Sequence, residues 1–443
     1  MIDYLILYEH KTREYENVLL LKVSLEKKGY SVIIEQVNQL FGLKYINRVR
    51  KPKVIITFSM YNDHSLIWQV LSVGWNVRKV VNLQWEQIYS NSQRSVDYHT
   101  PSENATKAVH ICWGDRCKDR LRNSGVKNAV VTGAIQLDFL RPAFSTYFLS
   151  KETLKQKYHF PNGRMILFIS SFTQVGLKRE QIKELSRKLG DGYINGIPVA
   201  LATRCTTIEW LCGLLESDPE CFVVYRPHPG EHIDQKLEDK AKKAKGRFYI
   251  IKDYAINQWI KIADFILTWT STSIAEVFFA NKQCYILRPY DLDDECDMQL
   301  YKGAYTIDCF QTLLSVFNGE SKDFPVSEDL MYQFYDKSIE YSYLRVIKVL
   351  EQVYKEDAYD IKSYPINLYY SAAIRIIKGI IVNFILNKHI SSEKIIFRML
   401  PKIAKKLDSL YNSQRKLTME MVSKEESEEI ERRLKTIINI IER

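Results

Sequence analysis

Two hydrophobic periods alternate along the first 140 residues. Short runs rich in Val, Ile and Leu predict strands, and the stretches between them repeat apolar residues every three or four positions, as helices do. The expected strands are 4–8, 31–36, 53–59, 79–85, 110–114 and 128–133, and the expected helices are 14–28, 64–73 and 115–124. Strands that are almost wholly apolar and alternate with helices predict a parallel sheet covered on both faces.

The same alternation begins again after a polar stretch at 141–163. The second set of expected strands is 164–170, 222–226, 248–252, 265–269 and 284–288, with helices at 232–245, 256–263 and 273–281. The pattern therefore predicts an α/β protein with two doubly wound Rossmann-like domains facing a cleft, at 1–145 and 164–328.

Beyond residue 328 the pattern is helical only. We expect crossover helices at 329–360, which return to the first domain, and a basic helical extension at 361–443. Residues 362–416 contain eleven Lys or Arg against two acidic residues, Glu393 and Asp408, and so carry most of the net charge of +10. Such local asymmetry is typical of an interaction surface.

Composition narrows the class of protein. A hydrophobic fraction of 46% in 443 residues is that of a packed globular chain. The N-terminus lacks the pattern of a signal peptide, no run of about 18 uncharged apolar residues predicts a membrane span, and the eight Cys lack zinc-ligand spacing. We therefore expect a cytoplasmic protein. Nucleic acid is not an expected partner, because the positive charge lies outside any base-reading motif.

The turn at 226–230 is the strongest chemical signal. A hydrophobic strand ends at Arg226, and Pro227, His228, Pro229 and Gly230 follow before a helix. Ligands of open α/β sheets bind at the carboxyl ends of strands, where imidazole and guanidinium groups can contact phosphate and glycine permits close backbone approach. The structural alternative is a histidine that caps the helix.

A hydroxyl cluster is the second signal. The strand at 265–269 runs into Thr270, Ser271, Thr272 and Ser273, and a helix follows at once. Such a helix start can bind an anion, although Ser273 with Glu276 also fits a capping box. Ser170 and Ser171, at the end of the strand 164–170, join the candidate donor site.

These motifs together resemble those of GT-B glycosyltransferases that build bacterial surface polysaccharides. They are similar to motifs of enzymes that use cytidine nucleotides, namely sialyltransferases, Kdo transferases and the CDP-glycerol and CDP-ribitol polymerases. The resemblance implies that His228 and Ser271–Ser273 bind the donor phosphate, and that Glu276 contacts the donor ribose. Similarity to a surface-carbohydrate group extends through the first half, at 8–16, 85–87, 112–121 and 132–142.

The family's catalytic carboxylate belongs to the first domain, but no motif fixes its position here. Candidates follow the ends of strands. We rank Glu86 first, because the neighbouring Trp85 could stack on a sugar and raise the carboxylate pKa, and Glu9 with His10 second. Asp115 is a further candidate that fits a helix N-cap.

Metal and cofactors are not expected. The acidic run Asp291, Asp293, Asp294 and Asp297 could suggest a metal, but a solvated loop is the preferred interpretation, and the family neutralises the leaving phosphate without one. The predicted function is transfer of a sugar from a nucleotide donor, for which a CMP-linked sugar is favoured, to a polysaccharide or lipid-linked acceptor.

Several alternatives remain open. They are a CDP-glycerol or CDP-ribitol phosphotransferase, a nucleotide-sugar epimerase and a non-catalytic scaffold that binds nucleotide or polyanion. The segment 364–418 combines apolar runs with Lys and Arg, which suits a helix in a membrane interface. It predicts peripheral attachment to the inner face of the cell membrane, although the same apolar faces could pack on the catalytic domains.

Overall fold

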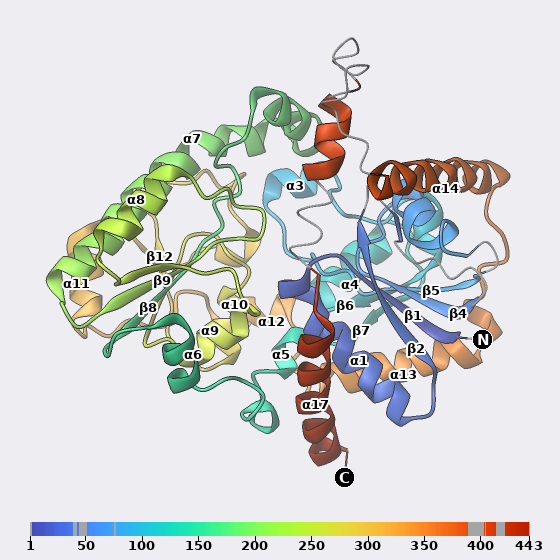
Figure 1. Ribbon diagram of the computed structural model, residues 1–443, viewed down its shortest axis with the longest axis horizontal. Coiled ribbons are helices and arrows are strands. Elements are labelled where there is room, and N and C mark those ends of the chain that lie inside the picture. Colours follow the sequence, from blue (N-terminus) through green and yellow to red (C-terminus); the bar gives the residue numbers. More distant parts are fainter. Residues whose placement is uncertain are drawn as a thin grey trace. The chain divides into compact units, whose positions relative to one another are not determined.

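The computed structural model describes residues 2–38, 42–43, 51–74, 77–388, 403, 405–412 and 421–442 (Figure 1). The chain forms two compact units. Unit 1 comprises Met1–Gln87, His99–Ile135 and Asp336–Arg443, and unit 2 comprises Ile88–Tyr98 and Gln136–Tyr335. Each unit is therefore built from segments that are separate in the sequence. Residues 88–98 interrupt the first half of the chain and belong to unit 2, and the chain after residue 335 belongs to unit 1.

Unit 1 contains a seven-stranded sheet in the order β3-β2-β1-β4-β5-β6-β7. Its pairs are parallel except for β2 with β3, which is antiparallel. The strands are β1 (Ile2–Tyr8), β2 (Val32–Asn38), β3 (Gly42–Leu43), β4 (Pro52–Thr57), β5 (Lys79–Asn82), β6 (Val109–Cys112) and β7 (Ala129–Val131). All six strands expected in this half are present, and β3 is an addition.

The helices of unit 1 are mostly short in the first half of the chain and longer in the C-terminal part. They are η1 (Lys11–Tyr15), α1 (Glu16–Lys27), α2 (Asp63–Leu66), η2 (Ile67–Leu71), η3 (Glu103–Lys107), α4 (Asp115–Asn123), α13 (Ser342–Lys355), η6 (Asp357–Tyr359), α14 (Ile366–Asn387) and α17 (Lys424–Ile441). Both η1 and η2 are π-helical turns. The expected helix at 14–28 therefore begins three residues early, with a π-helical first turn.

The C-terminal helices pack on the sheet and helices of unit 1. From α13, the Leu350 carbonyl accepts a hydrogen bond from Tyr4 Oη at 3.1 Å. From α17, Ser427 Oγ lies 2.6 Å from Tyr15 Oη, and the apolar face of the helix is buried. The charged segment at the C-terminal end is thus an amphipathic helix whose apolar side belongs to the core of unit 1.

Unit 2 contains a six-stranded, wholly parallel sheet in the order β10-β9-β8-β11-β12-β13. The strands are β8 (Met165–Ile169), β9 (Phe222–Arg226), β10 (Phe248–Ile250), β11 (Phe265–Thr268), β12 (Tyr285–Leu287) and β13 (Thr306–Ile307). Its helical elements are α3 (Asn91–Ser95), η4 (Pro142–Phe144), α6 (Lys151–Tyr158), α7 (Arg179–Ser217), α8 (Gln235–Lys243), α9 (Ile256–Ile262), α10 (Ile274–Phe279), η5 (Gln299–Tyr301), α11 (Phe310–Phe317) and α12 (Glu328–Phe334). The helix α5 (Ile135–Asp138) lies at the boundary of the two units.

Helix α7 is the largest element that the sequence pattern does not reveal. It runs for 39 residues with Pro198 inside it, and local propensity argues against a helix at such a position. Burial of Leu211, Leu214 and Leu215 against the core of unit 2 supplies the stabilisation that propensity lacks. Tertiary packing, rather than local propensity, therefore determines that this segment is helical.

Candidate functional site

Three neighbouring strands of unit 2 bring the two sequence motifs to one edge of the sheet. Arg226 of β9 is in register with Ile169 of β8, and Ile169 is in register with Thr268 of β11. The residues that follow these three positions therefore leave the sheet at the same level. The sequence between the motifs contains β10, but in space β8 lies between them and β10 is an edge strand.

A buried carboxylate, Glu231, holds the His228 turn in place. It accepts hydrogen bonds from Ser170 Oγ at 2.5 Å and Tyr225 Oη at 2.6 Å, and it pairs with Arg204 Nε at 3.4 Å. Burial raises the pKa of Glu231, while the bonds from Ser170 and Tyr225 oppose that shift. Ser170 is thus engaged inside the protein, which makes it a positioning residue. Sequence reasoning overlooked Glu231, although its place directly after the turn was a usable signal.

The His228 ring is exposed and has a defined orientation. Its Nδ1 accepts a hydrogen bond from the backbone N–H of Gly230 at 3.0 Å. An Nδ1 that accepts leaves the proton of the neutral ring on Nε2, so Nε2 is the donor. A Cβ at position 230 would lie 3.4 Å from this Nδ1, an ordinary van der Waals contact, so the position of the imidazole does not require a glycine here. The close backbone approach of Gly230 to a ligand stays a prediction.

Arg226 has a different role from the expected phosphate contact. Its side chain is buried and donates to the carbonyl oxygens of Ile251, at 3.0 Å, and Tyr254. Burial lowers the pKa of Arg226 to about 10. The guanidinium therefore holds the loop after β10 in place through these hydrogen bonds, and we treat Arg226 as a positioning residue.

Hydrogen bonds from neighbouring residues fix the conformation of the hydroxyl cluster. Ser271 Oγ accepts from the backbone N–H of Ser273 at 3.2 Å, and Tyr301 Oη donates to the Ser271 carbonyl at 2.7 Å. Ser171 Oγ lies 3.2 Å from Thr270 Oγ1 and so joins the end of β8 to this cluster. Thr272 occupies the centre of the same turn.

The capping box predicted from Ser273 and Glu276 is not formed. Ser273 precedes α10 in a helical conformation, and its side chain makes no capping hydrogen bond. Burial instead raises the pKa of Glu276 to about 7, and its Oε2 has no hydrogen-bond partner among the residues that the structure describes. A buried carboxyl oxygen without a partner is costly unless a ligand satisfies it.

The acidic run contributes to structure through Asp297. Both of its carboxylate oxygens accept from Arg288 at 2.9 Å, and Arg288 also donates to the Trp269 carbonyl at 3.0 Å. Asp293 accepts from the backbone of Glu295 at 2.8 Å. In the described ranges, no three His, Cys, Asp or Glu residues gather as metal ligands would.

Unit 1 places Glu86 in a charged cluster after β5. Arg13 Nη1 lies 3.0 Å from Glu86 Oε1, and His99 Nδ1 lies 2.8 Å from Glu86 Oε2. Burial would raise the pKa of Glu86, but His99 and Arg13 outweigh burial and hold it well below its ordinary range. This corrects the prediction of a raised pKa. Trp85 is itself buried, so the stacking surface expected for a sugar is not offered.

Glu9 differs from Glu86 although it is near the same cluster. Its backbone N–H donates to Glu14 at 2.7 Å, and its own carboxylate lies 4.0 Å from His10 Nε2. Burial raises the pKa of Glu9, with Glu14 adding to the shift and His10 opposing it. Sequence reasoning missed Arg13 and Glu14, which closely follow Glu9 in the chain, and His99, which comes from a separate segment. A carboxylate with a raised pKa is the better proton acceptor of the two.

Asp115 lies outside this cluster. It is the first residue of α4, after the N-cap Gly114, and its side chain is 79% exposed beside Lys118 at 3.8 Å. The N-cap position is instead Gly114, which makes no side-chain capping hydrogen bond, so the cap expected from Asp115 is not formed.

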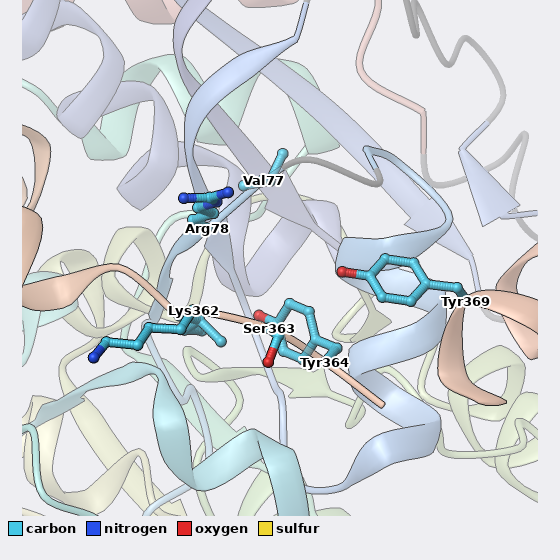
Figure 2. A pocket seen from close by; sticks show the side chains of 7 residues that line it. Val77, Arg78, Lys362, Ser363, Tyr364 and Tyr369 are labelled. Atoms are coloured by element: carbon cyan, nitrogen blue, oxygen red, sulfur yellow. The ribbon is translucent and has the colours of Figure 1, made fainter. Parts of the chain in front are cut away.

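A small pocket of about 180 Å³ occurs elsewhere in unit 1 (Figure 2). Its lining residues are Val77, Arg78, Ile361, Lys362, Ser363, Tyr364 and Tyr369. Val77 and Arg78 precede β5, so the pocket lies at the amino end of a strand whose carboxyl end leads to Glu86. The pocket is therefore separate from the charged cluster.

Two doubly wound Rossmann-like units in one chain, followed by C-terminal helices, define the GT-B class of fold. No family model and no curated protein matches the chain. Among solved structures, the chain is similar to a putative UDP-N-acetylglucosamine 2-epimerase from Listeria monocytogenes, with 13% identity, a TM-score of 0.49 and coverage of 82% of this chain and 99% of that one.

Two further structures show a similar level of likeness. UDP-GlcNAc 2-epimerase from Methanocaldococcus jannaschii, in complex with UDP-GlcNAc and UDP, has 14% identity and a TM-score of 0.47, with coverage of 80% and 100%. The wall teichoic acid polymerase TagF has 9% identity and a TM-score of 0.49, with coverage of 80% of this chain and 89% of that one. The fold class rests on the two sheets themselves.

Proposed function

We propose that this chain is a glycosyltransferase whose unit 2 binds the phosphates of a nucleotide-sugar donor. The observation that carries the proposal is the meeting of the His228 turn and the hydroxyl cluster of Ser271–Ser273 on either side of β8. Phosphate oxygens accept hydrogen bonds from imidazole N–H, hydroxyl and backbone N–H groups. These are the groups that this edge presents.

Glu276 supports a nucleotide in particular. Its buried carboxyl, raised in pKa and lacking a partner at Oε2 within the described part of the chain, suits the hydroxyls of a ribose. Each sugar hydroxyl can donate to a carboxyl oxygen. Hydrogen-bond donors for the phosphates and a hydrogen-bond acceptor for the ribose hydroxyls thus belong to the same unit. The donor base is proposed to be cytosine, from the motif resemblance alone.

The reaction is proposed as displacement at the anomeric carbon of the donor. An acceptor hydroxyl forms the new C–O bond, the bond to the nucleotide phosphate breaks, and a carboxylate takes the hydroxyl proton. We assign this proton to Glu9, since contacts with His99 and Arg13 hold the pKa of Glu86 low, whereas burial raises the pKa of Glu9. Hydrogen bonds from unit 2 stabilise the charge that develops on the leaving phosphate.

A thermal-shift screen with CMP, CDP, UDP and GDP tests the proposal. A ligand that binds only the folded state raises Tm by mass action. We expect a cytidine nucleotide to give the largest shift, and His228→Ala to reduce it strongly. His159→Ala is the matched control, because His159 is an exposed histidine of unit 2 at the C-cap of α6, before β8.

The outcomes separate the levels of the proposal. A larger shift with UDP or GDP would retain the phosphate site and reject the cytidine assignment. Equal shifts for the wild-type chain and His228→Ala would reject the phosphate site. The absence of a shift with all four nucleotides would contradict the proposed function.

A further inference from the structure

Helix α14 has two faces with opposite surroundings. One face packs on η2 of unit 1, with Leu368, Ala372 and Leu386 buried. From the same region, the Arg375 guanidinium lies 5.9 Å from the centroid of the Trp68 ring, a cation–π contact. Figure 1 shows α14 on the opposite side of the unit 1 sheet from α1 and α13. The helix is thus held along one side by the folded unit.

The other face of α14 is apolar and exposed. Its members recur every three or four positions, as one stripe of a helix requires. They are Ile366, Tyr370, Ile374, Ile377, Ile381 and Phe384, with exposures from 36% for Ile374 to 83% for Ile366. Single exposed apolar residues are ordinary, whereas a continuous stripe of this length marks an interaction surface.

The surroundings of the stripe are positively charged. Ile366–Asn387 contains no acidic residue, and Lys378 and Lys388 are exposed on or beside the helix. Arg78 and Lys362 line the pocket next to the start of α14, where Tyr364 and Tyr369 also lie (Figure 2). An apolar stripe among cations and tyrosines, with no acid on the helix, complements an anionic lipid surface.

We propose that α14 docks unit 1 on the surface of an anionic bilayer. The stripe enters the boundary between headgroups and acyl chains, and Arg78, Lys362, Lys378 and Lys388 contact the lipid phosphates. In the described ranges α14 is also the one helix long and apolar enough to cross a membrane, by length and composition. This finding modifies the expectation that no segment is long and apolar enough to span a membrane. The packing of Leu368, Ala372 and Arg375 on unit 1 favours a helix that lies in the plane of the surface.

Docking through α14 is independent of the donor chemistry. The helix and its cations belong to unit 1, whereas the proposed phosphate site belongs to unit 2. An enzyme held in this way would meet acceptors attached to lipid. Failure of one proposal therefore leaves the other standing, because nucleotide binding and lipid binding are measured separately.

Sedimentation of the full chain with vesicles tests the inference. We expect the chain to pellet with phosphatidylcholine vesicles containing about 30% phosphatidylglycerol, to bind pure phosphatidylcholine far more weakly, and to be released by about 0.5 M salt. The double variant Ile377→Glu with Ile381→Glu should lower the partition coefficient at least about tenfold. Ile339→Glu is the matched control, since Ile339 is 94% exposed in unit 1 outside α14.

A second variant tests the charges while leaving the stripe intact. Lys362→Gln with Lys378→Gln and Lys388→Gln should also reduce binding at least about tenfold, and only to anionic vesicles. Unchanged Tm and an unchanged nucleotide shift in both variants would show that the units remain folded.

Four outcomes would overturn the inference. They are wild-type chain that stays in the supernatant with anionic vesicles, stripe variants that pellet as well as Ile339→Glu, protein that resists alkaline extraction as a spanning segment would, and a stable dimer in solution that the stripe variants dissociate. The last would assign the stripe to a second copy of the chain.

Discussion

The carboxyl edges of the two sheets carry polar clusters that are built in opposite ways. In unit 2 a buried carboxylate, Glu231, lies behind the His228 turn, and the groups in front are ring N–H and hydroxyls. In unit 1 the charges face one another, as Arg13 and His99 both contact Glu86. Hydrogen-bond donors on a turn of fixed conformation suit the binding of an anion. Charged side chains that contact one another instead suit a structural role, in which they stabilise the conformation of a loop. The comparison is the reason why the proposed reaction assigns the base to Glu9, at the margin of the charged cluster.

The largest effect is expected from Glu9→Gln. Loss of a general base typically lowers turnover about 10²–10⁴-fold, while donor affinity should stay the same because the phosphate site is in unit 2. Initial rates and nucleotide titrations on the same preparation measure the two effects. Glu86→Gln is the comparison variant. If it removes turnover while Glu9→Gln does not, the order of the two carboxylates is reversed.

Next in size is the cost of removing the anchor of the His228 turn. Glu231→Ala leaves the buried groups of Ser170, Tyr225 and Arg204 without their shared acceptor, which should cost about 3 kcal/mol of the free energy of unfolding. Urea denaturation gives the value. Glu238→Ala, at an exposed position in α8, should change it by less than about 0.5 kcal/mol. Similar costs for both variants would contradict the anchoring role.

A smaller effect separates the two carboxylates of unit 1 by pH. The pKa of Glu86 is below its ordinary value of 4.5, so its ion pairs stabilise the fold above that value and the stabilisation is lost as pH falls toward the folded-state pKa. Glu9 has a raised pKa, so its ionisation opposes folding above pH 4.5. At pH 7, Glu86→Gln should destabilise the fold by at most about 1 kcal/mol and Glu9→Gln should not destabilise it, because both groups are partly exposed.

Urea denaturation at pH 7 and in acid checks this difference. The acid loss of stability should be smaller in Glu86→Gln than in the wild-type chain. The same raised pKa predicts that turnover declines on the acid side as Glu9 becomes protonated, at a pH above 4.5. A Glu86→Gln chain with the wild-type stability at both pH values would show that its ion pairs contribute nothing measurable.

The smallest effect concerns Ser273. Its side chain does not cap α10, so Ser273→Ala should change the free energy of unfolding by less than about 0.5 kcal/mol while weakening nucleotide binding. Ser327→Ala is the contrast, because Ser327 accepts from the Leu330 N–H at 3.3 Å and caps α12, so its loss should cost about 1 kcal/mol. Thermal denaturation and nucleotide titration would distinguish the two serines. A loss of stability in Ser273→Ala equal to that in Ser327→Ala would restore a capping role.

The sequence was most informative where local pattern and burial agree. The strand 222–226 coincides with β9, and all five strands expected in the second half occur, because fully buried strands of a parallel sheet are continuous apolar runs. Helix α7 was not predicted, because Pro198 and nearby glycines oppose a helix that packing then enforces. Its stability comes from contacts distant in the chain, which periodicity does not reveal.

The candidate sites were partly predictable for the same reason. His228 and Ser271–Ser273 follow strands directly, so their place at the sheet edge could be expected from spacing alone. The roles of Glu86 and Arg226, in contrast, are fixed by partners that are distant in sequence. Glu86 obtains its low pKa from Arg13 and His99, and Arg226 is held by carbonyls of residues 251 and 254. A charged group's neighbours, which determine its pKa, emerge only from the folded chain.

The most direct test of the phosphate site is a calorimetric cycle with two ligands and two chains. The nucleoside diphosphate that gives the largest thermal shift, and the same nucleoside without phosphates, are titrated into the wild-type chain and into His228→Ala. Loss of a hydrogen bond from Nε2 to a charged phosphate should weaken the diphosphate about tenfold to hundredfold and leave the nucleoside unchanged. If His228→Ala weakens both ligands equally, or neither, His228 does not bind the donor phosphate and the central claim is wrong.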